Sequence, residues 1–133
     1  MIQTQFTLYL PNRPGVLALV TRKLAAAKVN IEGVSAATSA DIGLVQIVVD
    51  NAAAAARVLK QSKISVTTQK VAVLPMRNRP GELARITSKL AAGGVNINYV
   101  YGTTCRGDSG CECGMVVSAP DLKKVERIWA QIR

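Results

Sequence analysis

The chain has 133 residues and a hydrophobic content of 49%, which is too high for a disordered protein. Its formal net charge is +9, but the 17 Lys and Arg residues are dispersed and aromatic residues make up only 4%. That composition disfavours nucleic-acid binding, which uses a basic patch and aromatic stacking. No apolar run is long enough to span a bilayer and no signal peptide opens the chain, so we expect a cytoplasmic protein that does not enter a membrane.

The first half of the chain predicts the order strand, helix, strand, strand, helix, strand. Alternating side chains indicate the first strand, and Pro14 suits the first turn of a helix. Asp50 or Asn51 can cap the second helix, which is rich in alanine. The predicted elements are a strand over 2–10, a helix after Pro14, strands over 29–37 and 43–50, a helix over 52–61 and a strand over 64–68.

The second half repeats this order but stops one strand short. A capping box at Ser118–Asp121 opens the last predicted helix, and the chain ends with it. One edge of the second sheet must therefore be covered in some other way. The predicted elements are a strand over 71–76, a helix ending at Gly93-Gly94, strands over 95–102 and 113–118, and a helix over 121–132.

The two halves are copies of one unit. Residues 78–102 match residues 12–36 at 15 of 25 positions, and Asn-Arg-Pro-Gly stands at the start of both segments. A repeat of this kind indicates two domains, 1–69 and 70–133. Each would be an α+β, ferredoxin-like βαββαβ unit, the second lacking its last strand.

The Asn-Arg-Pro-Gly turn, followed by Val-Asn-Ile at the next strand, resembles the ACT domain over nearly the whole chain, twice. The resemblance implies a stand-alone tandem ACT protein, a non-catalytic regulator that binds a small ligand, most often an amino acid. Free N–H groups at a helix N-terminus favour a carboxylate, and Gly15 has no side chain to block it. Asn replaces the family's usual Asp at Asn12 and Asn78, which weakens the recognition of an amino group because the amide carries no charge.

The ligand would lie at the seam between the copies, with Asn12 facing Asn96 and Asn78 facing Asn30. A tight turn without a ligand explains the Pro and Gly equally well, and Asn30 and Asn96 also suit turns. The predicted site residues are Asn12, Arg13, Pro14, Gly15, Val16, Leu17, Asn30 and Ile31 in the first copy, and Asn78, Arg79, Pro80, Gly81, Glu82, Leu83, Asn96 and Ile97 in the second.

The three cysteines, Cys105, Cys111 and Cys113, crowd into one connection of the second copy. Their spacing fits no recognised zinc pattern and the chain has no His, so we expect neither a metal site nor a cofactor. A regulatory thiol near Arg106 remains an alternative. Tyr99 and Tyr101 share one face of a strand, and we expect a pocket wall or an interface there rather than RNA stacking.

The leading hypothesis is therefore an amino-acid-binding regulator that acts on a further protein. A ligand-free interaction module is the main alternative, while an enzyme or an RNA-binding protein fits less well because no nucleophile–base pair is recognisable. We also expect a homodimer. The open sheet face of the second copy carries Val71, Val73 and Val116, and an apolar face of this kind is normally covered.

Overall fold

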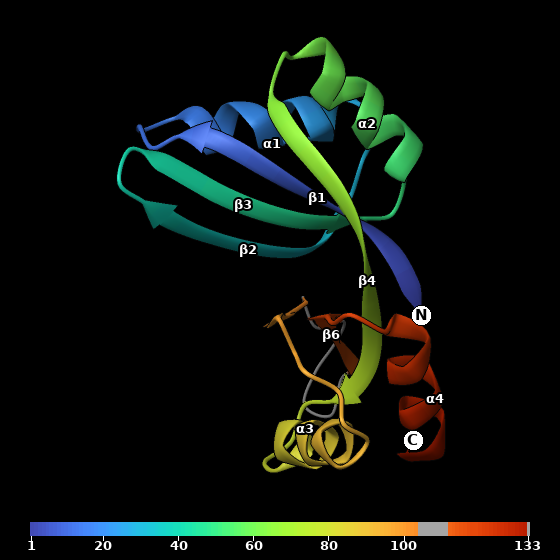
Figure 1. Ribbon diagram of the computed structural model, residues 1–133. Helices are drawn as coiled ribbons and strands as arrows, with labels where there is room; N and C mark the ends of the chain where they lie inside the picture. The colour runs from blue at the N-terminus through green and yellow to red at the C-terminus, as the bar shows by residue number, and fades with distance from the viewer. Residues whose placement is uncertain (104–111, 133) are drawn as a thin grey trace. The chain divides into compact units, whose positions relative to one another are not determined.

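The computed structural model describes residues 1–103 and 112–132. These residues form two compact units, one of Thr4–Gln69 and one of Met1–Gln3 together with the chain from Lys70 onward. We call them copy one and copy two. Each copy packs two helices against one face of an antiparallel sheet, and Figure 1 shows this layering for α1 and α2. The predicted α+β, ferredoxin-like fold is confirmed.

Copy one has the sheet order β2-β3-β1-β4. Its apolar core lies between this sheet and the helices, where Leu8 of β1, Leu24 of α1 and Leu59 of α2 are each at most 1% exposed. Alternation along β1 places Phe6, Leu8 and Leu10 on the helix side. The elements are β1 (Ile2–Pro11), α1 (Val16–Ala26), β2 (Ile31–Ser39), β3 (Ile42–Val49), α2 (Ala52–Gln61) and the first residues of β4 (Ser65–Arg77).

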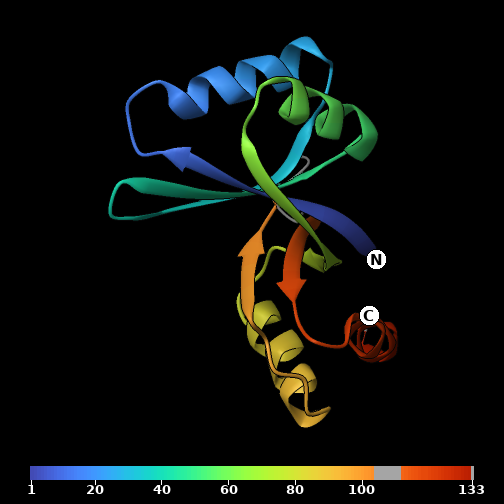
Figure 2. The same ribbon diagram turned by 45° about the horizontal axis from the view of Figure 1, so that its top comes forward.

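Copy two uses the first residues of β1 in place of its missing strand. The Val73 N–H donates to the Met1 carbonyl over 2.7 Å, and the Met1 amine donates to the Val73 carbonyl over 2.9 Å. Its sheet order is accordingly β1-β4-β6-β5, and Figure 2 shows β5 and β6 side by side. Its other elements are α3 (Glu82–Ala92), β5 (Tyr99–Gly102), β6 (Glu112–Ser118) and α4 (Leu122–Ile132).

Several predicted boundaries differ from the structure. The strands predicted over 64–68 and 71–76 form the single strand β4, because no residue between them breaks the extended backbone. The capping box is wrong, since Ser118 ends β6 and Asp121 alone caps α4 by accepting from the Lys124 N–H. Asn51 caps α2 as one of the two predicted candidates, accepting from the Ala54 N–H over 3.0 Å.

The open sheet face of copy two includes Val71, Val73 and Val116, and Val73 is half-buried. Val71 and Val116 are both 0% exposed in the single chain. The edge beside β4 is likewise paired with Met1. The homodimer stays a prediction. Among the described residues, no helix combines the length and hydropathy that crossing a bilayer requires.

A protein that begins at Thr4, released from a cleavable tag, should be less stable than the full chain. It loses two backbone hydrogen bonds to Val73, which together contribute about 1–3 kcal/mol. Urea unfolding measures this loss, and hydrogen exchange at the Val73 amide should accelerate. The control Ile2→Ala keeps the backbone bonds and should exchange slowly. Equal exchange at Val73 in both proteins would contradict the pairing.

Candidate functional site

The Asn-Arg-Pro-Gly turn of copy one joins β1 to α1 through a left-handed glycine. Gly15 immediately precedes the helix at φ +86°, a conformation that costs other L-residues about 1–2 kcal/mol. The turn is anchored by the Asn12 N–H, which donates to the Asp41 carbonyl over 2.8 Å. Gly81 repeats this geometry in copy two at φ +85°.

The turn of copy one presents unpaired backbone donors to solvent. Within the described part of the chain, the N–H groups of Gly15, Leu17 and Ala18 donate to no acceptor. All three residues are exposed, and the first turn of α1 carries no acidic side chain. Because the helix dipole adds positive potential at this end, the turn favours an anionic group.

The equivalent turn of copy two already holds a carboxylate. Glu82 takes the position of Val16 and is 3% exposed. It accepts from Arg79 Nε over 2.9 Å and from an Nη of Arg85. The Arg85 and Arg79 hydrogen bonds lower the pKa of Glu82 below its ordinary value of 4.5, so it stays ionised at neutral pH. The two predicted sites therefore have the same backbone conformation but differ in the charge of their side chains.

A small cavity of about 170 Å³ opens between the motif turn of copy one and the far end of β2. Asn12, Arg13 and Leu17 line one side, and Ala36 and Thr38 line the other. Leu17 is 41% exposed. The β2 residues were not among the predicted site residues, although the turn near Ser39–Gly43 already places this strand end beside Pro11.

Asn30 lies at the opposite end of copy one from the motif turn. Ile31 pairs with Val49 whereas Pro11 pairs with Ile42, and the seven residue steps between these β3 positions span about 23 Å. The Asn30 backbone is tied to Asp50, donating to its Oδ1 over 2.9 Å.

Ile31 and Ile97 pack against the cores of their own copies, while Asn96 is exposed before β5. Within a copy, the structure therefore does not bring the asparagines of the Val-Asn-Ile segments to the motif turns. The pairing of Asn12 with Asn96, and of Asn78 with Asn30, stays a prediction.

The cysteine connection is only partly described. Cys113 lies on β6 and is disulfide-bonded, whereas Cys105, Arg106 and Cys111 fall outside the described residues. In the described part, no three His, Cys, Asp or Glu side chains gather as metal ligands would. The absence of a metal stays a prediction.

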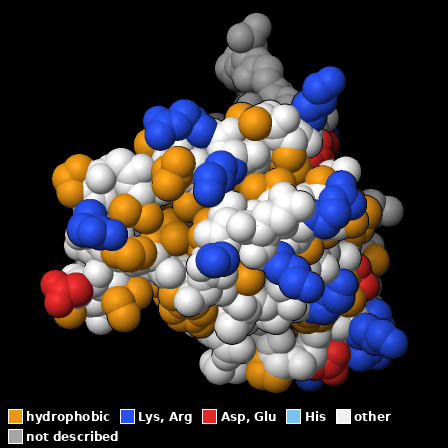
Figure 3. Space-filling view, turned by 90° about the horizontal axis from the view of Figure 1, so that it is seen from above, with side chains coloured by type: hydrophobic (Ala, Val, Ile, Leu, Met, Phe, Trp, Pro, Cys, Tyr) orange, Lys and Arg blue, Asp and Glu red, His pale blue; other side chains and the backbone are white. Residues whose placement is uncertain are grey.

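Tyr99 and Tyr101 stack on one face of β5, with ring centroids 6.3 Å apart. Burial raises the pKa of Tyr101 well above its ordinary value, which marks a partly desolvated ring. In Figure 3, Lys and Arg side chains are scattered over the visible face rather than gathered in a continuous basic patch.

Two ferredoxin-like units, each with a left-handed glycine at its strand-to-helix turn, define a tandem of small α+β modules. The sequence matches the family described as "ACT domain pair" over residues 1–120, and the chain belongs to that family. No curated protein matches the chain.

Solved structures share the whole fold. Protein BT0572 from Bacteroides thetaiotaomicron has a TM-score of 0.87 at 27% identity, covering 98% of this chain and 88% of that one. The ligand-free regulatory subunit of aspartate kinase from Thermus thermophilus has a TM-score of 0.70 at 18% identity, covering 98% of this chain and 94% of that one. The second likeness concerns the fold alone.

Gly15→Ala should destabilise the protein by about 1–2 kcal/mol, because alanine is strained at this left-handed position although its Cβ would meet no atom within 4 Å. Gly15→Asn should cost less. The matched control is Gly102→Ala, which also has open space but no positive φ. Denaturant unfolding compares the three variants. A Gly102→Ala loss as large as that of Gly15→Ala would refute the conformational explanation.

The β-branched Gly15→Val is therefore unsuitable as a binding probe, because its strain disturbs the fold.

Glu82→Gln should destabilise the protein at pH 7 and have a smaller effect in acid. The folded-state pKa of Glu82 lies below its unfolded value, so its stabilising contribution is complete above pH 4.5 and is lost as the pH falls through the folded pKa. Urea unfolding of both proteins from pH 7 to pH 3 measures this. A stability difference that stays constant over the whole range would contradict the ion pairing.

Proposed function

We propose that the protein is a non-catalytic regulator that binds a small amino acid at its motif turns. The observation that carries this proposal is that the N–H groups of Gly15, Leu17 and Ala18 donate to no acceptor among the described residues, which fits a carboxylate. Membership of the ACT domain pair family and the likeness to an aspartate kinase regulatory subunit support it.

The ligand's amino group would have a weaker hydrogen-bond partner than its carboxylate. The Asn12 side-chain oxygen can accept from an ammonium group, but it contributes no charge. The cavity beside it is bordered by Leu17, Ala36 and Ala37, which suits a short apolar side chain. Its volume of about 170 Å³ favours a small amino acid over an aromatic one.

The turn of copy one should bind more strongly than that of copy two. Glu82 places a negative charge at the N-terminus of α3, where it competes electrostatically with a ligand carboxylate. Its two arginine partners neutralise this charge in part. We therefore propose that the ligand binds more weakly at Asn78–Leu83 than at Asn12–Leu17.

A second chain is proposed to pair along β2, and the resulting homodimer would signal to a regulated protein. β2 is an edge strand of copy one, and its Val34 is 49% exposed. Exposed apolar residues on a free strand edge favour pairing with another strand. Because the β2 end also lines the motif cavity, a ligand there could shift the pairing between chains.

A thermal-shift screen over the twenty amino acids, followed by calorimetric titration, tests the proposal. An amino acid at 100 times its dissociation constant should stabilise the protein by about 2.7 kcal/mol. Leu17→Arg should weaken binding at least tenfold, and Leu83→Arg should have the smaller effect. The control Ala25→Arg adds the same charge to the other end of α1. Unchanged affinity in the Leu17→Arg, Leu83→Arg double variant, or no response to any amino acid, would overturn the proposal.

A further inference from the structure

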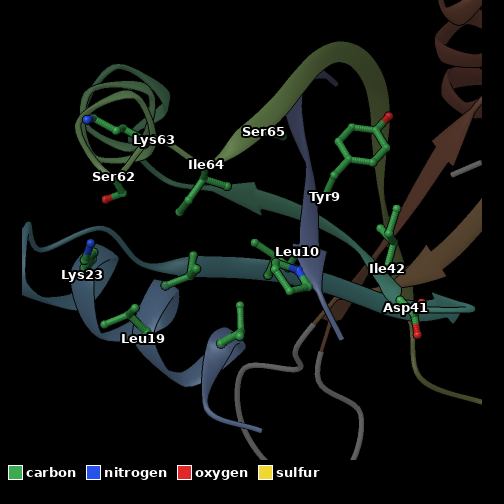
Figure 4. A pocket seen from close by; sticks show the side chains of 13 residues that line it. Tyr9, Leu10, Leu19, Lys23, Asp41, Ile42, Ser62, Lys63, Ile64 and Ser65 are labelled. Carbon is green, nitrogen blue, oxygen red and sulfur yellow. The ribbon is translucent and has the colours of Figure 1, made fainter. Parts of the chain in front are cut away.

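Copy one contains a second and larger cavity on the helix side of its sheet. It has a volume of about 540 Å³ and lies between α1, the end of β1 and the turn from α2 into β4. Its size falls in the range of small-molecule sites. Figure 4 shows its lining, most of which is apolar and includes Leu10, Leu19, Ile42 and Ile64.

Charged groups are placed unevenly around this cavity. Lys23, Ser62 and Lys63 lie toward one end of the lining in Figure 4, and Asp41 lies toward the other. Neither lysine forms an ion pair with a residue of the described ranges 1–103 and 112–132. The Ser62 hydroxyl donates to the Val58 carbonyl over 2.7 Å, so the two lysines are the donors at this end of the cavity.

The matching region of copy two carries an ion pair in place of apolar side chains. Glu82 and Arg85 stand where copy one has Val16 and Leu19, and they form an ion pair there. Arg85 Nη1 also donates to the Ile132 carbonyl over 2.5 Å and so links α3 to the end of α4. The cavity of about 520 Å³ beside this ion pair is lined by three arginines and two glutamates. Among the described residues, the lining at this place is therefore more apolar in copy one than in copy two.

We infer that the helix-side cavity of copy one binds a monocarboxylate with an apolar body. The lysine end would hold the carboxylate, and the leucine and isoleucine side chains would bury the rest of the molecule. Asp41 at the other end disfavours a second acidic group. The larger cavity adjoins the motif cavity and shares Leu10, Pro11 and Val16 with it, but Leu19 lines only the larger cavity and Leu17 only the smaller one.

Calorimetric titration with straight-chain monocarboxylates from butanoate to decanoate tests the inference. The affinity should rise with chain length, and one ligand should bind per chain. Octanamide, which matches octanoate in length but lacks its charge, should bind about tenfold more weakly or worse. Octylamine should show no measurable binding. Equal affinity for octanoate and octanamide, or no binding of any acid, would overturn the inference.

Substitutions of residues that line the larger cavity test where octanoate binds. Leu19→Arg should lower the octanoate affinity at least tenfold, and the fold should tolerate it because Arg85 stands at the equivalent position of copy two. The Lys23→Ala, Lys63→Ala double variant should lower it about tenfold while reducing the preference for octanoate over octanamide. Circular dichroism confirms that each variant is folded.

Leu17→Arg is the matched control because it alters the motif turn and spares the larger cavity. Full octanoate binding in Leu17→Arg together with its loss in Leu19→Arg supports the inference, whatever the amino-acid titrations show. Octanoate binding that survives Leu19→Arg, or that is lost only in Leu17→Arg, assigns the acid to the motif turn and contradicts the second site.

Discussion

The left-handed backbone of Gly15 and Gly81 is the constraint on which the two motif turns depend. Each glycine bends the chain from the end of a strand directly into a helix, at φ +86° and +85°. A side chain at either position would strain the turn without meeting any neighbour within 4 Å. The same bend leaves the first N–H groups of the helix pointing outward, so one backbone feature creates both the helix start and the proposed anion site.

Duplication preserved this backbone feature while the side chains around it diverged. Position Val16 of copy one corresponds to Glu82 of copy two, and Leu19 corresponds to Arg85. These two changes place an ion pair where copy one has an apolar cavity. They also supply a carboxylate to one helix end and leave the other without one. The two copies are therefore alike in fold and different in what they can bind.

Much of the fold could be predicted from local patterns, whereas its long-range pairing could not. Hydrophobic periodicity and the repeat predict the βαββαβ order, and Asn51 was one of two predicted caps for α2. No local signal shows that Met1–Gln3 pairs with Val73, because that contact joins residues 72 apart. The same limit explains why the burial of Val71 and Val116 could not be predicted from the sequence.

The candidate site was likewise predicted from the sequence only in part. The motif residues were predicted because glycine and proline at a strand-to-helix turn have specific backbone consequences. The larger cavity was not predicted, because Leu19 and Lys23 fit an ordinary amphipathic pattern in α1 and meet Ile64, just before β4, only in the folded chain. The Arg79–Glu82–Arg85 network has i,i+3 spacing and could have been recognised from the sequence.

Amide chemical shifts measured during an amino-acid titration test the central claim most directly. The titrant is the amino acid that gives the largest thermal shift, and the observed signals are the backbone N–H groups of both motif turns. The account predicts that the amides of Gly15, Leu17 and Ala18 shift first, with those of Leu83 and Ala84 following at higher concentration. Shifts centred away from both turns, or saturation at Leu83 before Leu17, would contradict it.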